Sequence, residues 1–284
     1  MKRVGYEEIG RRIYKPRIID YPLIEKGQIS IFGNNMRQCR LLLGLNREQM
    51  AYKLGVSSSQ YRKYEEEKSW MQMHTIMYFA LRVGMPFTYL FSSSIYYKLC
   101  SLTDAPKQLM PIQAYVNRCS DRQFEIFRML LDELFGEDGQ HTQYCIKKSL
   151  PQNKDIYNEL DNYYNIIAKG LVKFRNSTRL SCQDLADLLG IDRRTLSSYE
   201  KIDGNKRISV LMAMRFWAST GVNPLWLLRD TLIYKKSIIQ ILRMVWIQKR
   251  LHEFADTKIE KIIEIVKLID TEFIRTPSLP YLSV

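Results

Sequence analysis

Residues 46–65, NREQMAYKLGVSSSQYRKYE, decide the fold of the first half of this chain. The stretch has apolar residues at helical spacing, namely Met50, Ala51 and Leu54. Asn46 can cap that helix through its side-chain oxygen, and Gly55 can end it because glycine tolerates a positive φ. Ser57 can then cap a second helix over 58–66. The pattern therefore predicts two short helices joined by a tight turn.

A second stretch, SCQDLADLLGIDRRTLSSYE, repeats this pattern 135 residues later, over 181–200. Its cap, turn and second cap are Ser181, Gly190 and Asp192. Other matching pairs are Arg40 with Arg175, Leu54 with Leu189, and Tyr64 with Tyr199. Further on the shift becomes 137, so the second copy carries two extra residues near Asp203. An internal repeat of this kind predicts two copies of one structural unit.

Both copies resemble the Cro/C1 family of helix-turn-helix DNA-binding domains, over residues 32–91 and 167–229. The segments MHTIMYFALRVGMPFTYLF and ISVLMAMRFWASTGVNPLWLL resemble the last two helices of that family. The resemblance implies an all-α fold with two such domains, a helical linker and C-terminal helices. The expected divisions are a basic N-terminal arm (1–30), a first domain (31–95), a helical linker (96–160), a second domain (161–230) and a C-terminal helical region (231–284).

The resemblance also implies an ion pair between the first and third helices of each domain. The paired positions here are Arg40 with Glu65 and Arg175 with Glu200. A guanidinium can grip a carboxylate through two hydrogen bonds, which would fix the angle between the two helices.

In this family the third helix enters the major groove of DNA, and its early residues meet base edges. The positions that match are Ser58, Ser59, Arg62 and Lys63 in the first copy and Arg193, Arg194, Ser197 and Ser198 in the second. Arg193 and Arg194 are the better readers, because arginine can grip two acceptors of guanine at once. We expect Tyr61 and Leu196 to be buried instead.

The chain departs from the family pattern at two places. The second helix of the family begins with a glutamine that touches phosphate, and that position holds Arg47 in the first copy and Cys182 in the second. Arg47 can still hold a phosphate, whereas Cys182 is poorly suited to do so. An acidic run, Glu65 to Glu67, follows the third helix of the first copy. One domain could therefore bind DNA while its twin serves another purpose.

The composition favours a polyanionic partner and gives no sign of catalysis. The 284 residues carry a formal net charge of +13, which would attract nucleic-acid phosphates. The three histidines have no metal-ligand neighbours at useful spacing, and no phosphate-binding loop or nucleophile motif is present. We therefore expect no catalytic residues, no metal site, no cofactor and no enzyme activity. The arm over 1–30, which holds seven Lys or Arg, is read equally well as phosphate-binding or as a solvated tail.

No apolar run is long enough to cross a bilayer, and the N-terminus has no apolar leader segment, so we expect a cytoplasmic protein without a membrane partner. Two helices are expected at the C-terminal end, over 232–254 and 259–273. The second has an apolar stripe formed by Ile259, Ile262, Ile263, Val266, Ile269 and Phe273. It can pack on its own chain or on a second subunit, and we favour a homodimer.

The sequence thus predicts a bacterial or phage transcription regulator that binds double-stranded DNA sequence-specifically. Two unlike recognition helices on one chain would read an asymmetric site with halves about 10 bp apart. The alternative is a structural or protein-interaction protein, antitoxin-like or a co-regulator, in which one or both domains no longer read DNA.

Overall fold

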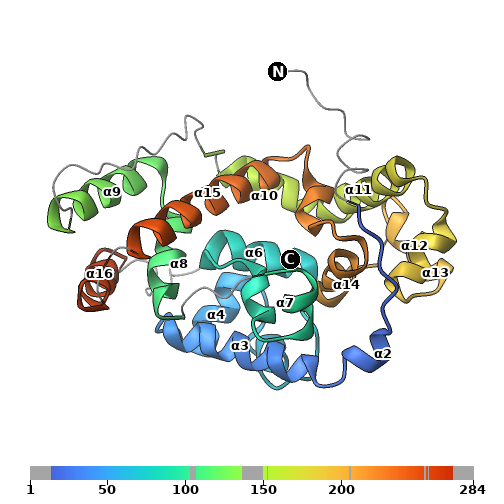
Figure 1. Cartoon of the computed structure of the whole chain (residues 1–284), viewed down its shortest axis with the longest axis horizontal. Coiled ribbons are helices and arrows are strands. Elements are labelled where there is room, and N and C mark those ends of the chain that lie inside the picture. The colour runs from blue at the N-terminus through green and yellow to red at the C-terminus, as the bar shows by residue number, and fades with distance from the viewer. Residues whose placement is uncertain are drawn as a thin grey trace.

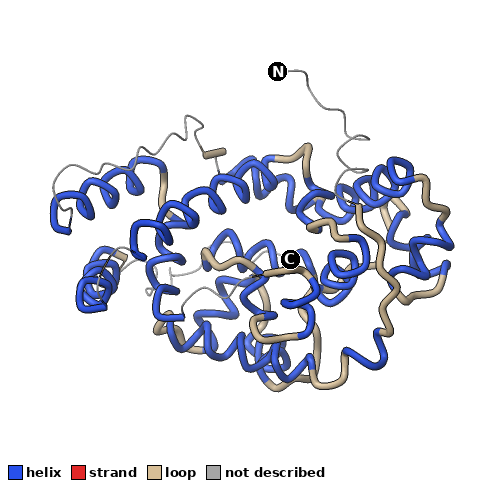
Figure 2. The backbone as a smooth tube through the Cα atoms, in the orientation of Figure 1, coloured by secondary structure: helices blue, strands red, loops and turns tan. Residues whose placement is uncertain are grey.

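The computed structural model describes residues 14–102, 107–135, 150–151, 153–204, 206–252, 254 and 256–270. These residues form helices joined by turns, and they contain no β-sheet (Figure 2). The predicted all-α class is confirmed.

The first unit is a sequence of short helices at the lower centre of Figure 1. Its elements are α3 (Gln28–Leu42), α4 (Arg47–Leu54), α5 (Ser58–Glu65), α6 (Met73–Tyr78), the π-helical turn η1 (Phe79–Val83) and the 3-10 helix η2 (Phe87–Phe91). The two helices predicted from residues 46–65 are α4 and α5. They begin at the expected residues, and α5 ends one residue earlier than expected.

The second unit, at the right of Figure 1, has the same order of helices. Its elements are α11 (Tyr163–Thr178), α12 (Cys182–Leu189), α13 (Arg193–Glu200), α14 (Val210–Thr220) and the 3-10 helix η4 (Pro224–Leu228). The starts of α12 and α13 lie 135 residues after those of α4 and α5, and the start of α14 lies 137 after that of α6. The repeat in the sequence is therefore a repeat of helices.

Local side-chain chemistry sets these helix ends. Asn46 accepts a hydrogen bond from the amide of Gln49, whose side chain in turn accepts one from the amide of Asn46, and Ser181 makes the same reciprocal pair with Asp184. The helices end at Gly55 (φ 66°) and Gly190 (φ 63°), in the left-handed region that glycine tolerates best. The caps expected at Ser57 and Asp192 are also present.

The two units meet where α6 and α14 begin, through an isolated antiparallel bridge. The amide of Met73 donates to the carbonyl of Ile208 at 2.9 Å. The amide of Val210 donates to the carbonyl of Met71 at 2.8 Å. Met71 and Met73 are the repeat equivalents of Ile208 and Val210, so each unit gives the other the same hydrogen bond. Such a reciprocal exchange between equivalent residues indicates a local twofold axis.

The segments that precede the units cross over in the same reciprocal way. Helix α2 (Tyr21–Ile24) precedes the first unit and packs on α14 of the second, where the guanidinium of Arg215 lies 4.5 Å from the ring centre of Tyr21. Helix α10 (Asn153–Asp161) precedes the second unit and packs on α6 of the first, where Tyr157 stacks on Tyr78 at 6.2 Å. Tyr78 and Arg215 are repeat equivalents, so the crossing follows the same axis as the bridge.

The prediction of a basic arm over 1–30 is wrong for residues 14–30, which pack on the rest of the chain. The amides of Lys15 and Arg17 donate to carbonyls at the end of α14, at 2.7 Å each. Tyr21 is 2% exposed, and its hydroxyl donates to the carbonyl of Leu188 at 3.0 Å. Gln28 already begins α3. Residues 1–13 lie outside the described residues.

A second hydrophobic core lies at the left of Figure 1, between helices from two regions of the sequence. They are α8 (Met110–Arg118), α9 (Asp121–Phe135), α15 (Leu232–His252) and α16 (Asp256–Ile269). The remaining short helices of this part of the chain are α7 (Ile95–Leu99) and η3 (Lys107–Leu109). Part of the helical linker expected over 96–160 therefore forms one layer of this second core. Phe124 on α9 packs edge to face on Trp246 of α15, with ring centres 5.7 Å apart.

The apolar stripe expected on α16 packs largely within the chain, and the homodimer itself stays a prediction. Ile259, Ile262 and Val266 are at most 7% exposed within the single chain, where they pack in the second core. These three residues of the stripe are therefore covered by the chain's own helices, and Ile263 is partly buried. Ile269 is 49% exposed, and Phe273 lies outside the described residues.

Candidate nucleic-acid interface

Helix α5 is held to α3 by a nearly buried carboxylate. Glu65, whose side chain is 1% exposed, accepts hydrogen bonds from Arg40 at 2.6 Å, Arg47 at 2.7 Å and the hydroxyl of Tyr61 at 2.9 Å. Burial tends to raise the pKa of Glu65, but these three donors outweigh it and leave the pKa below its ordinary value. The structure thus brings together the predicted pair Arg40 and Glu65, and it adds two donors.

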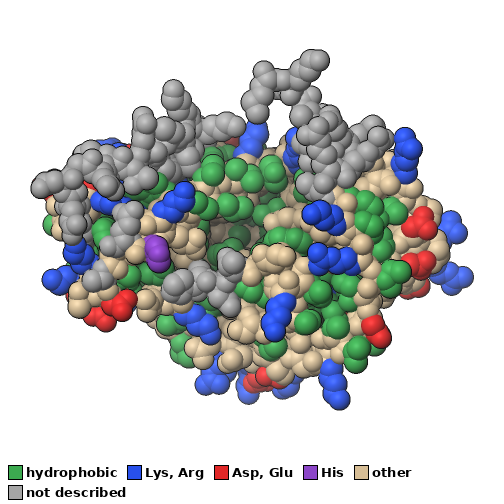
Figure 3. Space-filling model, in the orientation of Figure 1, with side chains coloured by type: hydrophobic (Ala, Val, Ile, Leu, Met, Phe, Trp, Pro, Cys, Tyr) green, Lys and Arg blue, Asp and Glu red, His purple; other side chains and the backbone are tan. Residues whose placement is uncertain are grey.

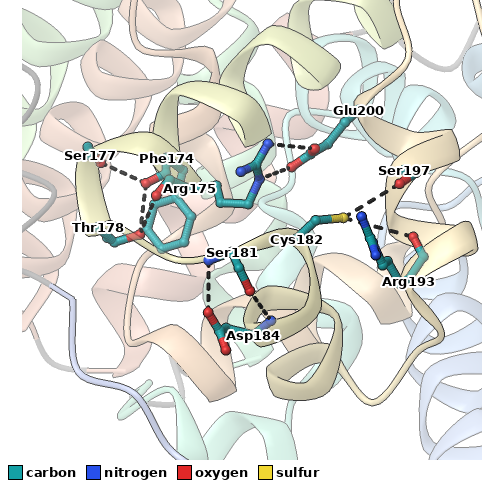
Figure 4. Close-up of polar contacts among 10 residues, drawn as sticks. All are labelled: Phe174, Arg175, Ser177, Thr178, Ser181, Cys182, Asp184, Arg193, Ser197 and Glu200. Carbon is teal, nitrogen blue, oxygen red and sulfur yellow. Dashed lines mark hydrogen bonds and ion pairs between the residues drawn. The ribbon is translucent and has the colours of Figure 1, made fainter.

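Helix α13 is held to α11 by the equivalent pair (Figure 4). Arg175 donates to the two carboxylate oxygens of Glu200 at 2.9 and 3.1 Å. The two side chains are 22% and 10% exposed, so this pair is more exposed to solvent than its counterpart in the first unit. The pair fixes α13 against the helix before it, as the sequence predicts.

The start of α13 presents two arginines to solvent. Arg193 and Arg194 are exposed, and neither side chain has a hydrogen bond or ion pair within the described part of the chain. Leu196, one turn along, is fully buried and holds the helix to the core, as expected. The guanidinium groups are therefore available to an external acceptor, while the backbone that carries them is fixed.

The two serines of α13 differ from each other. Ser197 is exposed, and its hydroxyl lies 3.5 Å from the sulfur of Cys182 (Figure 4). Ser198 donates to the carbonyl of Thr195 at 2.6 Å and is half-buried, so its hydroxyl is directed at its own helix. Of the four positions expected to face DNA, Ser198 is the least accessible.

In the first unit, two of the arginines expected to face DNA are bound to acidic side chains. Arg47 is bound to Glu65, and Arg62 makes an i,i+4 ion pair with Glu66. Glu66 is also bound by Lys68, at 2.7 Å, and its pKa falls to about 2 because these two cations stabilise the carboxylate. The remaining positions on α5, Ser58, Ser59 and Lys63, are exposed. The surface of α5 is therefore less cationic than that of α13.

The first residue of α12 shows why the units differ. In the first unit this position is Arg47, whose guanidinium reaches across to the carboxylate of Glu65. In the second unit it is Cys182, whose sulfur lies 3.9 Å from the carbonyl of Arg193 and makes no ion pair with Glu200. Arg175 is therefore the one described cation bound to Glu200, and no cation of α12 or α13 binds that carboxylate.

The sequence analysis missed one further cation at this surface. Lys206 is exposed beside α13, and its ammonium lies 3.2 Å from the hydroxyl of Thr195 and 5.5 Å from the ring centre of Tyr199. It follows the two extra residues of the second copy and is followed by Arg207, which is also exposed. The Lys206–Arg207 pair directly after the two extra residues, where the first copy has Ser69 and Trp70, was the signal that could have identified it.

On the face shown in Figure 3, lysine and arginine side chains project at many points, and acidic side chains lie at the right edge, over the second unit, and also at the lower left and lower edge. No group of three or more His, Cys, Asp or Glu among the described residues could hold a metal ion. In the same part of the chain, we find no helix whose length and hydropathy would let it span a bilayer.

Comparison with known proteins adds no identity to this geometry. No protein-family model, curated protein or solved structure matches the chain. What α5 and α13 do must therefore be inferred from their own chemistry: two capped helices of equal length, each held by an arginine–glutamate pair, of which only α13 begins with two exposed arginines that bind no acidic side chain.

Proposed function

We propose that this chain is a sequence-specific DNA-binding regulator of transcription that contains two helix-turn-helix units of the Cro/C1 type. The helix lengths, caps and turns of both units match that motif, in which the second of two short helices enters the major groove. In this proposal α5 and α13 are the recognition helices, and the partner is double-stranded DNA.

One observation carries the proposal: Arg193 and Arg194 are exposed and bind no acidic group of the described chain, at the start of a helix whose backbone is fixed. Helix α13 does not need to move when DNA binds, because its position is already set by the Arg175–Glu200 pair and by the buried Leu196. Exposed arginines in this place can grip guanine in the major groove or bind phosphates.

A protein interaction is a second candidate function for the first unit. Arg47 and Arg62 are bound to Glu65 and Glu66, so α5 offers few cations to a phosphate backbone. This observation makes the second unit the main DNA contact, and it leaves the first unit with weaker DNA contacts or, in the second candidate function, with a protein partner. A chain with this division of labour would still be a DNA-binding protein.

The test is binding of the full chain to a pool of random-sequence duplexes at low salt, followed by a salt titration. We expect binding that weakens as salt rises, because counterions are released from the phosphates. In Arg193→Glu/Arg194→Glu we expect the affinity to fall at least about tenfold, since two attractive charges become repulsive.

The matched control is Lys235→Glu/Lys249→Glu, which changes the charge by the same amount on the exposed face of α15. We expect it to lose far less affinity than the α13 variant. Equal losses in the two variants would show that net charge alone binds DNA, without α13. A wild-type chain that binds no duplex at low salt would contradict the proposal and favour the protein-interaction function for both units.

A further inference from the structure

The local axis at the bridge has a consequence for α5 and α13. Each of these helices is followed by a short loop that leads directly into the bridge: α5 ends at Glu65, before Gln72, and α13 ends at Glu200, before Ser209. Gln72 and Ser209 are repeat equivalents and pair with each other. Because equivalent residues pair at the bridge, the local axis relates α5 to α13 and places them on either side of it.

The crossing segments hold the units in this relation. Arg215 of the second unit donates to Glu25, which follows α2, at 2.7 Å and packs on Tyr21. In the first unit, Arg82 donates to the hydroxyl of Tyr157 on α10 at 3.4 Å. A shared core also runs through both units. The axis therefore rests on the bridge, two reciprocal crossings and common packing, which together make the pair of units one rigid arrangement.

We propose that a single chain covers a whole imperfect inverted repeat, with α13 on one half-site and α5 on the other in the opposite orientation. A homodimer of one-unit chains reads an inverted repeat because its two recognition helices are related by twofold symmetry. Here both helices belong to one chain, so one copy suffices. This inference rests on the proposed DNA-binding function and adds the arrangement of the target and the stoichiometry.

The two half-sites contribute unequally. The half under α13 meets Arg193 and Arg194, which are suited to guanine, together with Lys206 nearby. The half under α5 meets Ser58 and Ser59, short side chains that make fewer contacts with bases. The target is therefore a strong half that contains guanine and a weak half, related by inversion.

The experiment uses a site recovered by selection on the full chain, rebuilt with its two halves in inverted and in direct orientation at the same spacing. We expect the inverted site to bind at least about tenfold tighter than the direct one, since only the inverted site engages both helices. Native mass spectrometry of the complex should show one chain per duplex. Equal affinity for the two orientations, preference for the direct repeat, or two chains per duplex would overturn the inference.

Spacing gives a second measurement on the same duplexes. Insertion of about 5 bp turns one half to the opposite face of the helix, so we expect affinity to fall to that of the strong half alone. In Arg215→Met, which removes the clamp on Tyr21 and Glu25, we expect this spacing dependence to weaken while affinity for the strong half alone is kept. If affinity depends on spacing as strongly in this variant as in the wild type, Arg215 does not position the units. If the wild-type affinity does not depend on spacing at all, the inference that both helices bind one duplex is overturned.

These outcomes distinguish failure of DNA binding from failure of the inverted arrangement. A chain that binds no duplex contradicts the proposed function and, with it, this inference. A chain that binds duplexes through Arg193 and Arg194 but ignores the orientation of the halves retains the proposed function and overturns only the inverted arrangement.

Discussion

The equivalent glutamates Glu65 and Glu200 have different surroundings because two of their neighbours differ. In the first unit, Arg47 at the start of α4 joins Arg40 and Tyr61 around Glu65. In the second unit the position of Arg47 holds a cysteine, and the position of Tyr61 holds a leucine, so Glu200 keeps only its arginine partner. These two substitutions leave Glu200 with one hydrogen-bonding side chain where Glu65 has three.

Replacing each glutamate with glutamine should therefore have unequal effects on stability. We expect Glu65→Gln to lower the free energy of unfolding by about 2–4 kcal/mol, because it leaves the buried Arg40 without a charged partner. Glu200→Gln should cost about 1 kcal/mol, since its pair is more exposed. Chemical denaturation of the two variants measures both values. Equal losses would show that the extra donors around Glu65 add nothing.

At the scale of elements, the sequence predicts the helices of each unit well, because their ends depend on local chemistry. Caps at Asn46 and Ser181 and glycines at positions 55 and 190 act within one turn of the chain, so their effect is visible in the sequence. The packing of α16 was not predictable in this way. Its apolar stripe shows that one face is buried, but not whether α8 or a second chain covers it.

The contact between α6 and α11 should be sensitive to pH. His74 on α6 lies against Tyr163 and Tyr164 of α11, with ring centres 6.1 and 6.0 Å away. Burial, with a smaller contribution from Arg207, lowers the pKa of His74 below its ordinary value. The neutral form is thus favoured in the folded state, and this stabilisation is present above pH 6.5, the unfolded-state value, and is lost as pH falls towards the lowered folded-state pKa.

We therefore expect the melting temperature to fall between about pH 7 and pH 5, and we expect His74→Gln to reduce that dependence. His252→Gln is a matched control, because His252 is exposed on α15. A pH dependence that is the same in both variants would assign it to groups other than His74.

At the scale of the whole molecule, the twofold relation between the units could not be predicted from the repeat. A repeat predicts two copies, but it leaves open whether they are arranged in parallel or by inversion. That choice depends on residues far apart in the chain, such as Met73 with Ile208 and Tyr21 with Arg215. Tyr21 gave no such signal in the sequence, where the segment over 1–30 is read as a basic arm or a tail.

The central claim is that α13 and α5 read two unlike half-sites of one DNA target. The most direct test is selection of bound duplexes from a random pool, carried out with the full chain and with Arg193→Ala/Arg194→Ala. We expect a motif with two unlike halves in the wild type and loss of the stronger, guanine-containing half in the variant. Recovery of no motif, or of the same complete motif with both proteins, would contradict it.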